Sequence, residues 1–165
     1  MCLVPSVADA CDIPVIAAGG LHDGRSILAA MMLGAEGVQL GSRFVATPES
    51  SAHVAFKQAV LDAGEGATSL ELKDVTPVRL LHNPFAQEVI EAQQRGATPE
   101  ELKALLGRGR AKRGMFEGDL NEGELEIGQI ASMISTLEPA ADLLTRLVSE
   151  CRALGGPALG GRFDF

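Results

Sequence analysis

Residues 13–20, IPVIAAGG, and residues 37–42, GVQLGS, decide the fold of this chain. Each is a short apolar run that stops at glycine, a pattern typical of a buried strand followed by a tight turn. Residues 24–33, which join them, repeat apolar side chains at helical spacing. Strands with almost no polar residue are expected where helices cover both faces of a parallel sheet. The pattern therefore predicts an α/β fold with two successive parallel strands.

A phosphate cradle is the functional interpretation of the two glycine turns. Glycine lets the backbone approach a ligand closely, and the helix that follows offers N–H groups and a partial positive charge. In (β/α)8 barrels the loops after the last two strands often hold a cofactor phosphate. The alternative is two tight turns that bind nothing, and Gln39 either bonds a ligand or faces a neighbouring strand. The candidate binding residues are Ala18, Gly19, Gly20, Gln39, Gly41 and Ser42.

The chain changes from this alternating pattern to a mostly helical one. A complete (β/α)8 barrel needs roughly 200 or more residues, so 165 residues cannot form a whole one. We expect 1–50 to be the last two βα units of such a barrel, 51–154 a helical extension, and 155–165 a disordered, glycine-rich tail. We expect helices at 4–11, 24–33, 52–63, 84–94, from Thr98, at 125–134 and from Pro139, strands at 14–18 and 37–40, and extended segments at 69–73 and 78–81.

Composition and charge exclude several classes of protein. The formal net charge is −8, from 22 acidic and 14 basic residues, so nucleic acid is not expected as a partner. No apolar run approaches the length of about 18 residues that a membrane-spanning helix requires, so no membrane association is expected. Cys2, Cys11 and Cys151 lack the spacing of metal ligands. We therefore expect no metal site and a cytoplasmic location.

Charged and histidine side chains support weaker hypotheses. Arg43 either offsets the charge of a phosphate or lies in solvent. The basic residues of 108–113 either hold an acidic group, such as a nucleotide phosphate, or form a solvated surface. Asp23 is expected to cap a helix. His53 and His82 have no carboxylate or cysteine at an interpretable spacing, and no catalytic residue is assigned.

Residues 123–130, GELEIGQI, form a second glycine-bearing unit. We expect an apolar helix over 125–134, in which Gly128 is costly because glycine loses roughly 1 kcal/mol to alanine in a helix interior. Close approach of a ligand would explain that cost, as would tight helix packing. Gln129, which follows the glycine, is therefore a further candidate binding residue.

Four stretches together resemble the C-terminal part of nitronate monooxygenases, formerly called 2-nitropropane dioxygenases. The FMN-dependent enoyl-acyl-carrier-protein reductases share that flavin-binding barrel and are similar too. The resemblance covers about residues 3–152. It is carried by VPSVADACDIPVIAAGGLHDGRSILAAMMLGAEGVQLGSRF (4–44), TPVRLLHNPF (76–85), GRGRAKRGMFEGDLNEGELEIGQIASMI (107–134) and EPAADLL (138–144).

This resemblance implies FMN as the cofactor and either a nitronate or an enoyl thioester as the small-molecule substrate. The glycine turns, with Gln39, would line the FMN phosphate pocket, and Gln129 would lie near flavin or substrate. In the family a catalytic histidine lies in a His-Thr-Gly-like loop after an earlier strand. His22, His53 and His82 do not match that position, so no catalytic residue is assigned. By the same resemblance, Met1 corresponds to a point beyond the middle of the family chain.

Three functions are consistent with these observations. The first is an FMN-dependent oxidoreductase of nitronate monooxygenase type that lacks the N-terminal part of the barrel. The second is an FMN-dependent enoyl-acyl-carrier-protein reductase. The third is a non-catalytic remnant that binds only phosphate or a partner chain. Two strands cannot close a sheet, and their exposed edges favour self-association.

Overall fold

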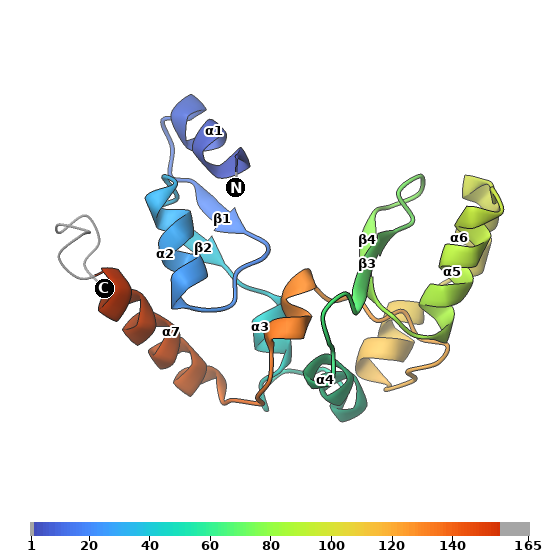
Figure 1. Ribbon diagram of the computed structural model, residues 1–165. Coiled ribbons are helices and arrows are strands. Elements are labelled where there is room, and N and C mark those ends of the chain that lie inside the picture. Colours follow the sequence, from blue (N-terminus) through green and yellow to red (C-terminus); the bar gives the residue numbers. More distant parts are fainter. Residues whose placement is uncertain (1, 156–165) are drawn as a thin grey trace. The chain divides into compact units, whose positions relative to one another are not determined.

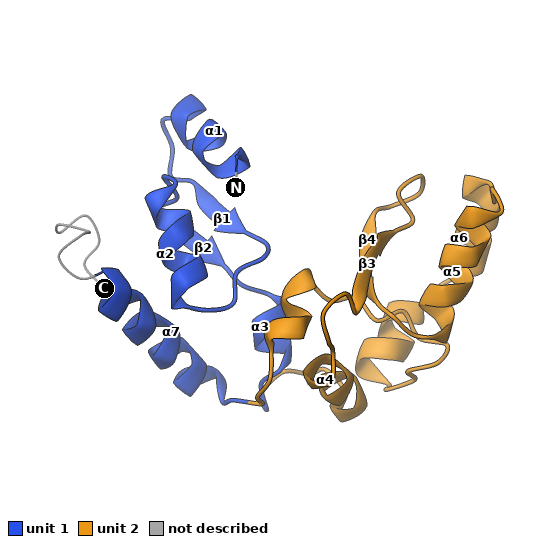
Figure 2. Cartoon of the chain, viewed as in Figure 1, with its two compact units in different colours: residues 1–49, 138–165 blue, residues 50–137 orange. Residues whose placement is uncertain are grey.

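The computed structural model describes residues 2–155 of the chain (Figure 1). The chain divides into two compact units, one made of residues 1–49 with 138–165 and the other of residues 50–137 (Figure 2). The division of the sequence into 1–50, 51–154 and 155–165 stays a prediction. The sequence gives no sign that the last helix returns to the first unit.

The predicted tail at 155–165 lies outside the described residues except for Gly155. Gly155 is the last residue of helix α7 and is buried. It therefore belongs to the final helix of the first unit.

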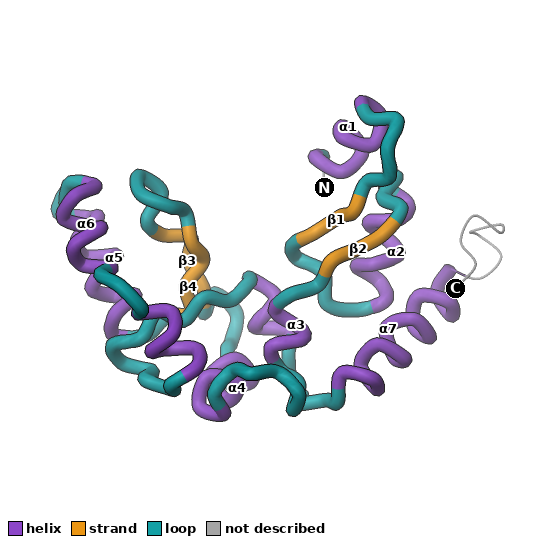
Figure 3. The backbone as a smooth tube through the Cα atoms, turned by 180° about the vertical axis from the view of Figure 1, so that it is seen from behind, coloured by secondary structure: helices purple, strands orange, loops and turns teal. Residues whose placement is uncertain are grey.

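Two parallel strands form the centre of the first unit, as predicted. Strand β1 (Ile16–Ala18) pairs with β2 (Gly37–Gln39), and Ala18 lies opposite Gln39 in the register. Figure 3 shows the two strands side by side. Both are shorter than the apolar runs that predict them. The helices of this unit are α1 (Leu3–Ala10), α2 (Gly24–Met32), α3 (Ser42–Val45) and α7 (Ala140–Gly155).

Helix α2 begins and ends where local signals place it. The side chain of Asp23 accepts a hydrogen bond from the Ser26 N–H, and the Ser26 hydroxyl accepts one from the Asp23 N–H, so the two form a capping box. After the C-cap Leu33 the chain turns at Gly34, whose φ of +103° favours glycine. The predicted helix over 24–33 is therefore confirmed to within one residue.

Helices α2 and α7 pack closely and supply the core of the first unit. Apolar side chains from both helices are buried together, and burial of each contributes about 1.5–3 kcal/mol. A Cβ atom at Gly24 would lie 2.4 Å from the Cβ of Glu150 and 2.7 Å from the backbone N of Cys151. Glycine at this position therefore allows the two backbones to approach. The buried cluster comprises Ile27, Met31, Leu143, Leu147 and Cys151.

The second unit combines a hairpin with helices. Its strands β3 (Thr68–Glu71) and β4 (Val78–Leu81) pair antiparallel, which confirms the two predicted extended segments. The core beside them contains Leu72, Phe85, Val89, Ala92 and Leu102. The helices are α4 (Val54–Leu61), α5 (Pro84–Gln94) and α6 (Pro99–Leu106), with the π-helix η1 (Lys112–Phe116) and the 3-10 helix η2 (Gln129–Met133).

Local capping signals also set the starts of α5 and α6. Asn83 accepts a hydrogen bond from the Ala86 N–H, and Thr98 forms a capping box with Glu101. A proline follows each cap, in a position where its missing N–H costs nothing. Both helices begin where the sequence predicts.

The predicted helix over 125–134 is wrong. Residues 125–127 instead lie beside β4, because the Leu81 N–H donates to the Leu125 carbonyl (2.8 Å) and the Ile127 N–H donates to the Arg79 carbonyl (3.2 Å). Only η2 is helical, and Gly128 before it has an extended backbone with φ −71° and ψ 161°. Leu125 and Ile127 are buried while Glu126 is exposed, which is the alternation of a strand. The energetic argument for a ligand beside Gly128 therefore no longer applies.

Two glycines cross in direct backbone contact within the second unit. A Cβ atom at Gly123 would lie 2.2 Å from the Cα of Gly114 and 2.3 Å from the Asp119 carbonyl oxygen. Both neighbours are backbone atoms, which cannot move aside as a flexible side chain can. The crossing thus fixes the path of the chain between η1 and residues 125–127, which lie beside β4.

We predict that Gly123→Ala lowers the free energy of unfolding of the second unit by roughly 3 kcal/mol, because the added methyl group meets backbone. Gly64→Ala is the matched control, since a Cβ atom there meets nothing within 4 Å. Urea unfolding followed by circular dichroism measures both. Equal stability of the two variants would contradict the crossing.

Candidate functional site

The two glycine turns leave the same edge of the parallel pair. Because Ala18 lies opposite Gln39, the residues that follow each strand begin at the same height. Carboxyl ends of adjacent parallel strands are where α/β proteins bind ligands. The structure therefore pairs Ala18 with Gln39 and places the predicted residues Gly19, Gly20, Gly41 and Ser42 after the same ends of the two strands, and their role as a site stays a prediction.

The backbone conformation requires glycine at some positions of this group and not at others. Gly19 and Gly20 have φ values of +94° and +74°, which side chains rarely tolerate. Gly41 has φ −109° and ψ −68°, a conformation that any residue adopts. A Cβ atom at Gly41 would meet nothing within 4 Å. Neither the backbone nor the packing of the chain therefore requires glycine at position 41.

Two other glycines of the same unit show the opposite situation. A Cβ atom at Gly37 would lie 2.8 Å from the Cδ1 of Ile16, and one at Gly24 would meet α7. Packing inside the chain explains both. Gly41 is different, because the space that its missing side chain leaves is open, as it also is at Gly64.

The N-terminus of α2 is already satisfied by carboxylates. The Ser26 N–H donates to Asp23 (2.8 Å), and the Gly24 N–H donates to Glu150 Oε2 (2.9 Å). Burial disfavours the charge of Asp23, but hydrogen bonds from the Ser26 backbone and from Arg25 lower its pKa to about 2. The first turn of α2 is thus occupied, and an anion would meet the turns themselves rather than this helix.

Arg43 lies in the first unit directly after the second glycine turn. Its side chain is only 4% exposed, and its Nη2 donates to Glu138 Oε2 at 2.7 Å. Burial lowers the pKa of this guanidinium, and the Glu138 carboxylate opposes that effect. The solvated interpretation of Arg43 is therefore wrong, and a carboxylate of the chain lies where the sequence suggested a phosphate.

Gln129 lies in the second unit, at the first position of η2, and its side chain is exposed. It is therefore not among the residues that the pairing of β1 with β2 brings together. Its place in a site stays a prediction.

The other charged and histidine residues have structural partners. His53 caps α4 by accepting a hydrogen bond from the Ala55 N–H, and His82 Nε2 lies 3.0 Å from the Ser69 hydroxyl. The basic cluster of 108–113 is largely paired rather than available to an anion. In it Arg110 lies over the Phe85 ring and pairs with Glu122, Lys112 pairs with Glu117, and Arg113 pairs with Asp119.

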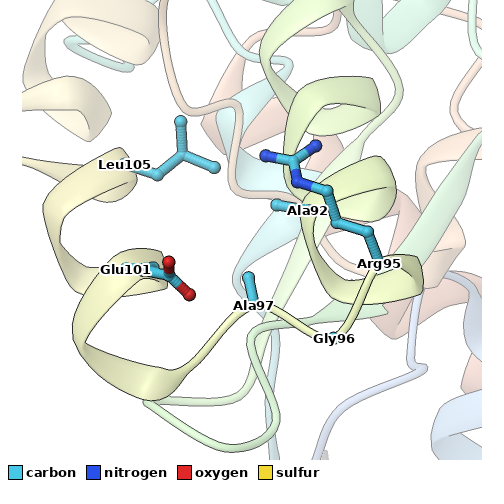
Figure 4. A pocket seen from close by; sticks show the side chains of 6 residues that line it. All are labelled: Ala92, Arg95, Gly96, Ala97, Glu101 and Leu105. Carbon is cyan, nitrogen blue, oxygen red and sulfur yellow. The ribbon is translucent and has the colours of Figure 1, made fainter.

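A shallow pocket of about 400 Å³ lies between α5 and α6. Figure 4 shows Glu101 and Leu105 on one side and Arg95 on the other, with Ala92 and Ala97 between them. Glu101 Oε2 already accepts a hydrogen bond from the Thr98 N–H (2.7 Å) and so serves the cap of α6.

Two absences hold for residues 2–155, the part of the chain that the structure describes. Within that range no helix is both long enough and apolar enough to cross a bilayer. The same residues contain no group of three or more histidine, cysteine, aspartate or glutamate side chains arranged to hold a metal ion.

We predict that Asp23→Ala destabilises the first unit by about 1 kcal/mol at neutral pH, the usual value of an N-cap. The pKa of Asp23 is lowered from 3.8 to about 2 in the folded chain, so its contribution is present above pH 4 and is lost as the pH falls towards 2. Urea unfolding of both proteins at several pH values measures this. The exposed Asp12→Ala is the control, and a difference that persists unchanged at pH 2 would rule out the carboxylate cap.

Comparison with known proteins agrees with this arrangement of strands and turns. A model of the nitronate monooxygenase family matches residues 1–150. A protein of Staphylococcus haemolyticus named as a probable nitronate monooxygenase is 34% identical over 93% of this chain and 43% of its own length. A Rhodococcus jostii protein, named (3aS,4S,5R,7aS)-5-hydroxy-7a-methyl-1-oxo-octahydro-1H-indene-4-carboxyl-CoA dehydrogenase, is 31% identical over 90% of this chain and 52% of its own.

Two solved structures are similar to the chain. FabK from Thermotoga maritima superposes with a TM-score of 0.87 at 36% identity, over 96% of this chain and 50% of its own. Nitroalkane oxidase from Streptomyces ansochromogenes gives a TM-score of 0.73 at 34% identity, over 96% of this chain and 45% of its own. The chain thus spans about half the length of these relatives. The match to the family model covers most of the sequence, and the chain belongs to the nitronate monooxygenase family.

Proposed function

We propose that this chain supplies the FMN-phosphate-binding loops of an FMN-dependent oxidoreductase of nitronate monooxygenase type. Its first unit would be the last two βα units of a (β/α)8 barrel, in which such loops often hold a cofactor phosphate. The observation that carries the proposal is Gly41. Its glycine is needed neither by φ nor by packing among the described residues, and it lies two residues after Gln39, whose partner Ala18 is followed by the Gly19–Gly20 turn.

The residues present fit a phosphate group. A Cβ atom at Gly19, Gly20 or Gly41 would meet nothing within 4 Å, so a ligand could approach the backbone of both turns closely, and backbone N–H groups in such turns bind phosphate well. Ser42 follows the second turn as the first residue of α3. Gln39 is exposed at the end of β2, and its side-chain amide would be available to a ligand at that end of the strand pair.

When bound, FMN supplies the isoalloxazine ring that takes up and passes on electrons. The residues of this chain bind and orient the cofactor through its phosphate. Because Gly19 and Gly20 have positive φ values, their turn has one conformation that is available to few other residues. A turn that is ordered before binding loses less entropy when the ligand arrives.

The substrate class has two candidates. Family membership favours a nitronate. The similarity to FabK and to the Rhodococcus carboxyl-CoA dehydrogenase favours an acyl thioester instead. Oxidation of a nitronate and NADH-dependent reduction of a crotonyl thioester, measured on FMN-loaded protein, separate the two. Flavin binding without either activity supports the non-catalytic alternative.

The first experiment measures the affinity of the full chain for FMN and for riboflavin, which lacks the phosphate. Flavin fluorescence, which is emitted in the visible range away from protein emission, reports binding. We expect FMN to bind at least tenfold more tightly than riboflavin, which corresponds to about 1.4 kcal/mol. Equal affinities, or no binding of either, would exclude the proposed cradle.

We predict that Gly41→Val weakens FMN binding at least tenfold and leaves riboflavin binding and the melting temperature unchanged. The valine side chain would occupy the phosphate space, while no atom of the chain lies there to be displaced. Gly64→Val, at another open glycine, is the matched control. Gly19→Val is less informative, because its φ of +94° makes any side chain strained.

A further inference from the structure

One continuous polar network runs along α7 and ends beside both glycine turns. Glu150 Oε2 accepts a hydrogen bond from the Gly24 N–H (2.9 Å), and Gly24 follows the Gly19–Gly20 turn by four residues. At the other end, Glu138 Oε2 accepts from Arg43 Nη2 (2.7 Å), and Arg43 follows Gly41 by two residues. These contacts join parts of the chain that are 126 and 95 residues apart.

Arg146 connects the two ends of this network. Its Nη2 donates to Glu138 Oε2 (2.9 Å) and its Nε to Glu138 Oε1 (3.0 Å), while its Nη1 donates to Glu150 Oε1. The arginine therefore pairs with carboxylates before and after it on the chain. The hydrogen bonds to Glu138 and Glu150 raise the pKa of Arg146. The hydrogen bond from Arg146 is the main cause that lowers the pKa of Glu138.

We infer that α7 is a splint that holds the two glycine turns in one geometry, with Glu138, Arg146 and Glu150 as positioning residues for the phosphate cradle. The inference rests on the proposed function for its ligand, but the splint itself is a property of the free chain. The strand pair alone does not fix the turns, because β1 and β2 share only three residue pairs and both turns lie beyond them.

The geometry supports a role in positioning beyond simple stability. The apolar stripe of Leu143 and Leu147 attaches α7 to α2, and Leu40 and Phe44, which flank the second turn, pack against the same cluster. The polar network adds hydrogen bonds to Gly24 and Arg43, each of which is close in sequence to a turn. Charge-assisted hydrogen bonds have narrow distance and angle requirements, so they determine geometry more strongly than apolar contact does.

The test uses Arg146→Met, which keeps aliphatic cover on α7 but removes the link between the two carboxylates. Arg152→Met is the matched control, because Arg152 lies on the same helix, is exposed and is not part of the network. The first readout is amide hydrogen exchange in the ligand-free chain at Gly24, whose N–H donates to Glu150, and at Phe44, whose N–H donates to the Gly41 carbonyl (2.9 Å). We expect exchange at these two amides, one beside each turn, to accelerate at least fivefold in Arg146→Met and to stay unchanged in Arg152→Met.

The second readout is the ratio of FMN to riboflavin affinity in the same two variants. We expect the ratio to fall at least fivefold in Arg146→Met only, since riboflavin has no phosphate for the turns to position. Unchanged exchange at both amides in Arg146→Met would overturn the splint, whatever the wild-type chain binds. If exchange accelerates in Arg146→Met but the wild-type chain does not prefer FMN to riboflavin, the splint is upheld and the proposed function is refuted.

Discussion

Parallel pairing of β1 with β2 is the interaction on which the candidate site depends. Three residue pairs set Ala18 opposite Gln39, and this register places two glycine turns at one edge although 21 residues separate them along the chain. A shift of one residue would turn the side chains of one strand to the opposite face and move its turn away from the other. The short strands therefore carry a large part of the functional geometry.

Helix α7 compensates for the small extent of that pairing. It buries an apolar stripe against α2 and adds polar contacts at its start, where the Ala140 N–H donates to Glu49 (3.1 Å), and near its end, where Glu150 reaches Gly24. All of these join the last described residues to the first fifty. A sheet of two strands is marginal by itself, and a helix packed on it is the usual way to stabilise it.

Local signals predicted much of this fold, and distant ones did not. The starts of three helices follow from Asp23, Asn83 and Thr98, whose caps involve neighbours three residues away. The error at 125–134 arose because the segment is apolar enough to suit either a helix or a strand, and only its contact with β4 decides between them. The Arg43–Glu138 pair spans 95 residues and leaves no local trace.

The candidate site stays a prediction, and the sequence did not give the reasons for the glycines near it. In the sequence neither Gly24 nor Gly41 shows why it is glycine. The structure separates them: the first makes room for another helix, whereas the second faces open space. Under the proposed function, folding and cofactor retention would be under separate control at position 41. A lineage that no longer needed a flavin could then acquire a side chain there and still produce a well-folded, colourless protein, which the quality-control machinery of a cell would have no reason to remove.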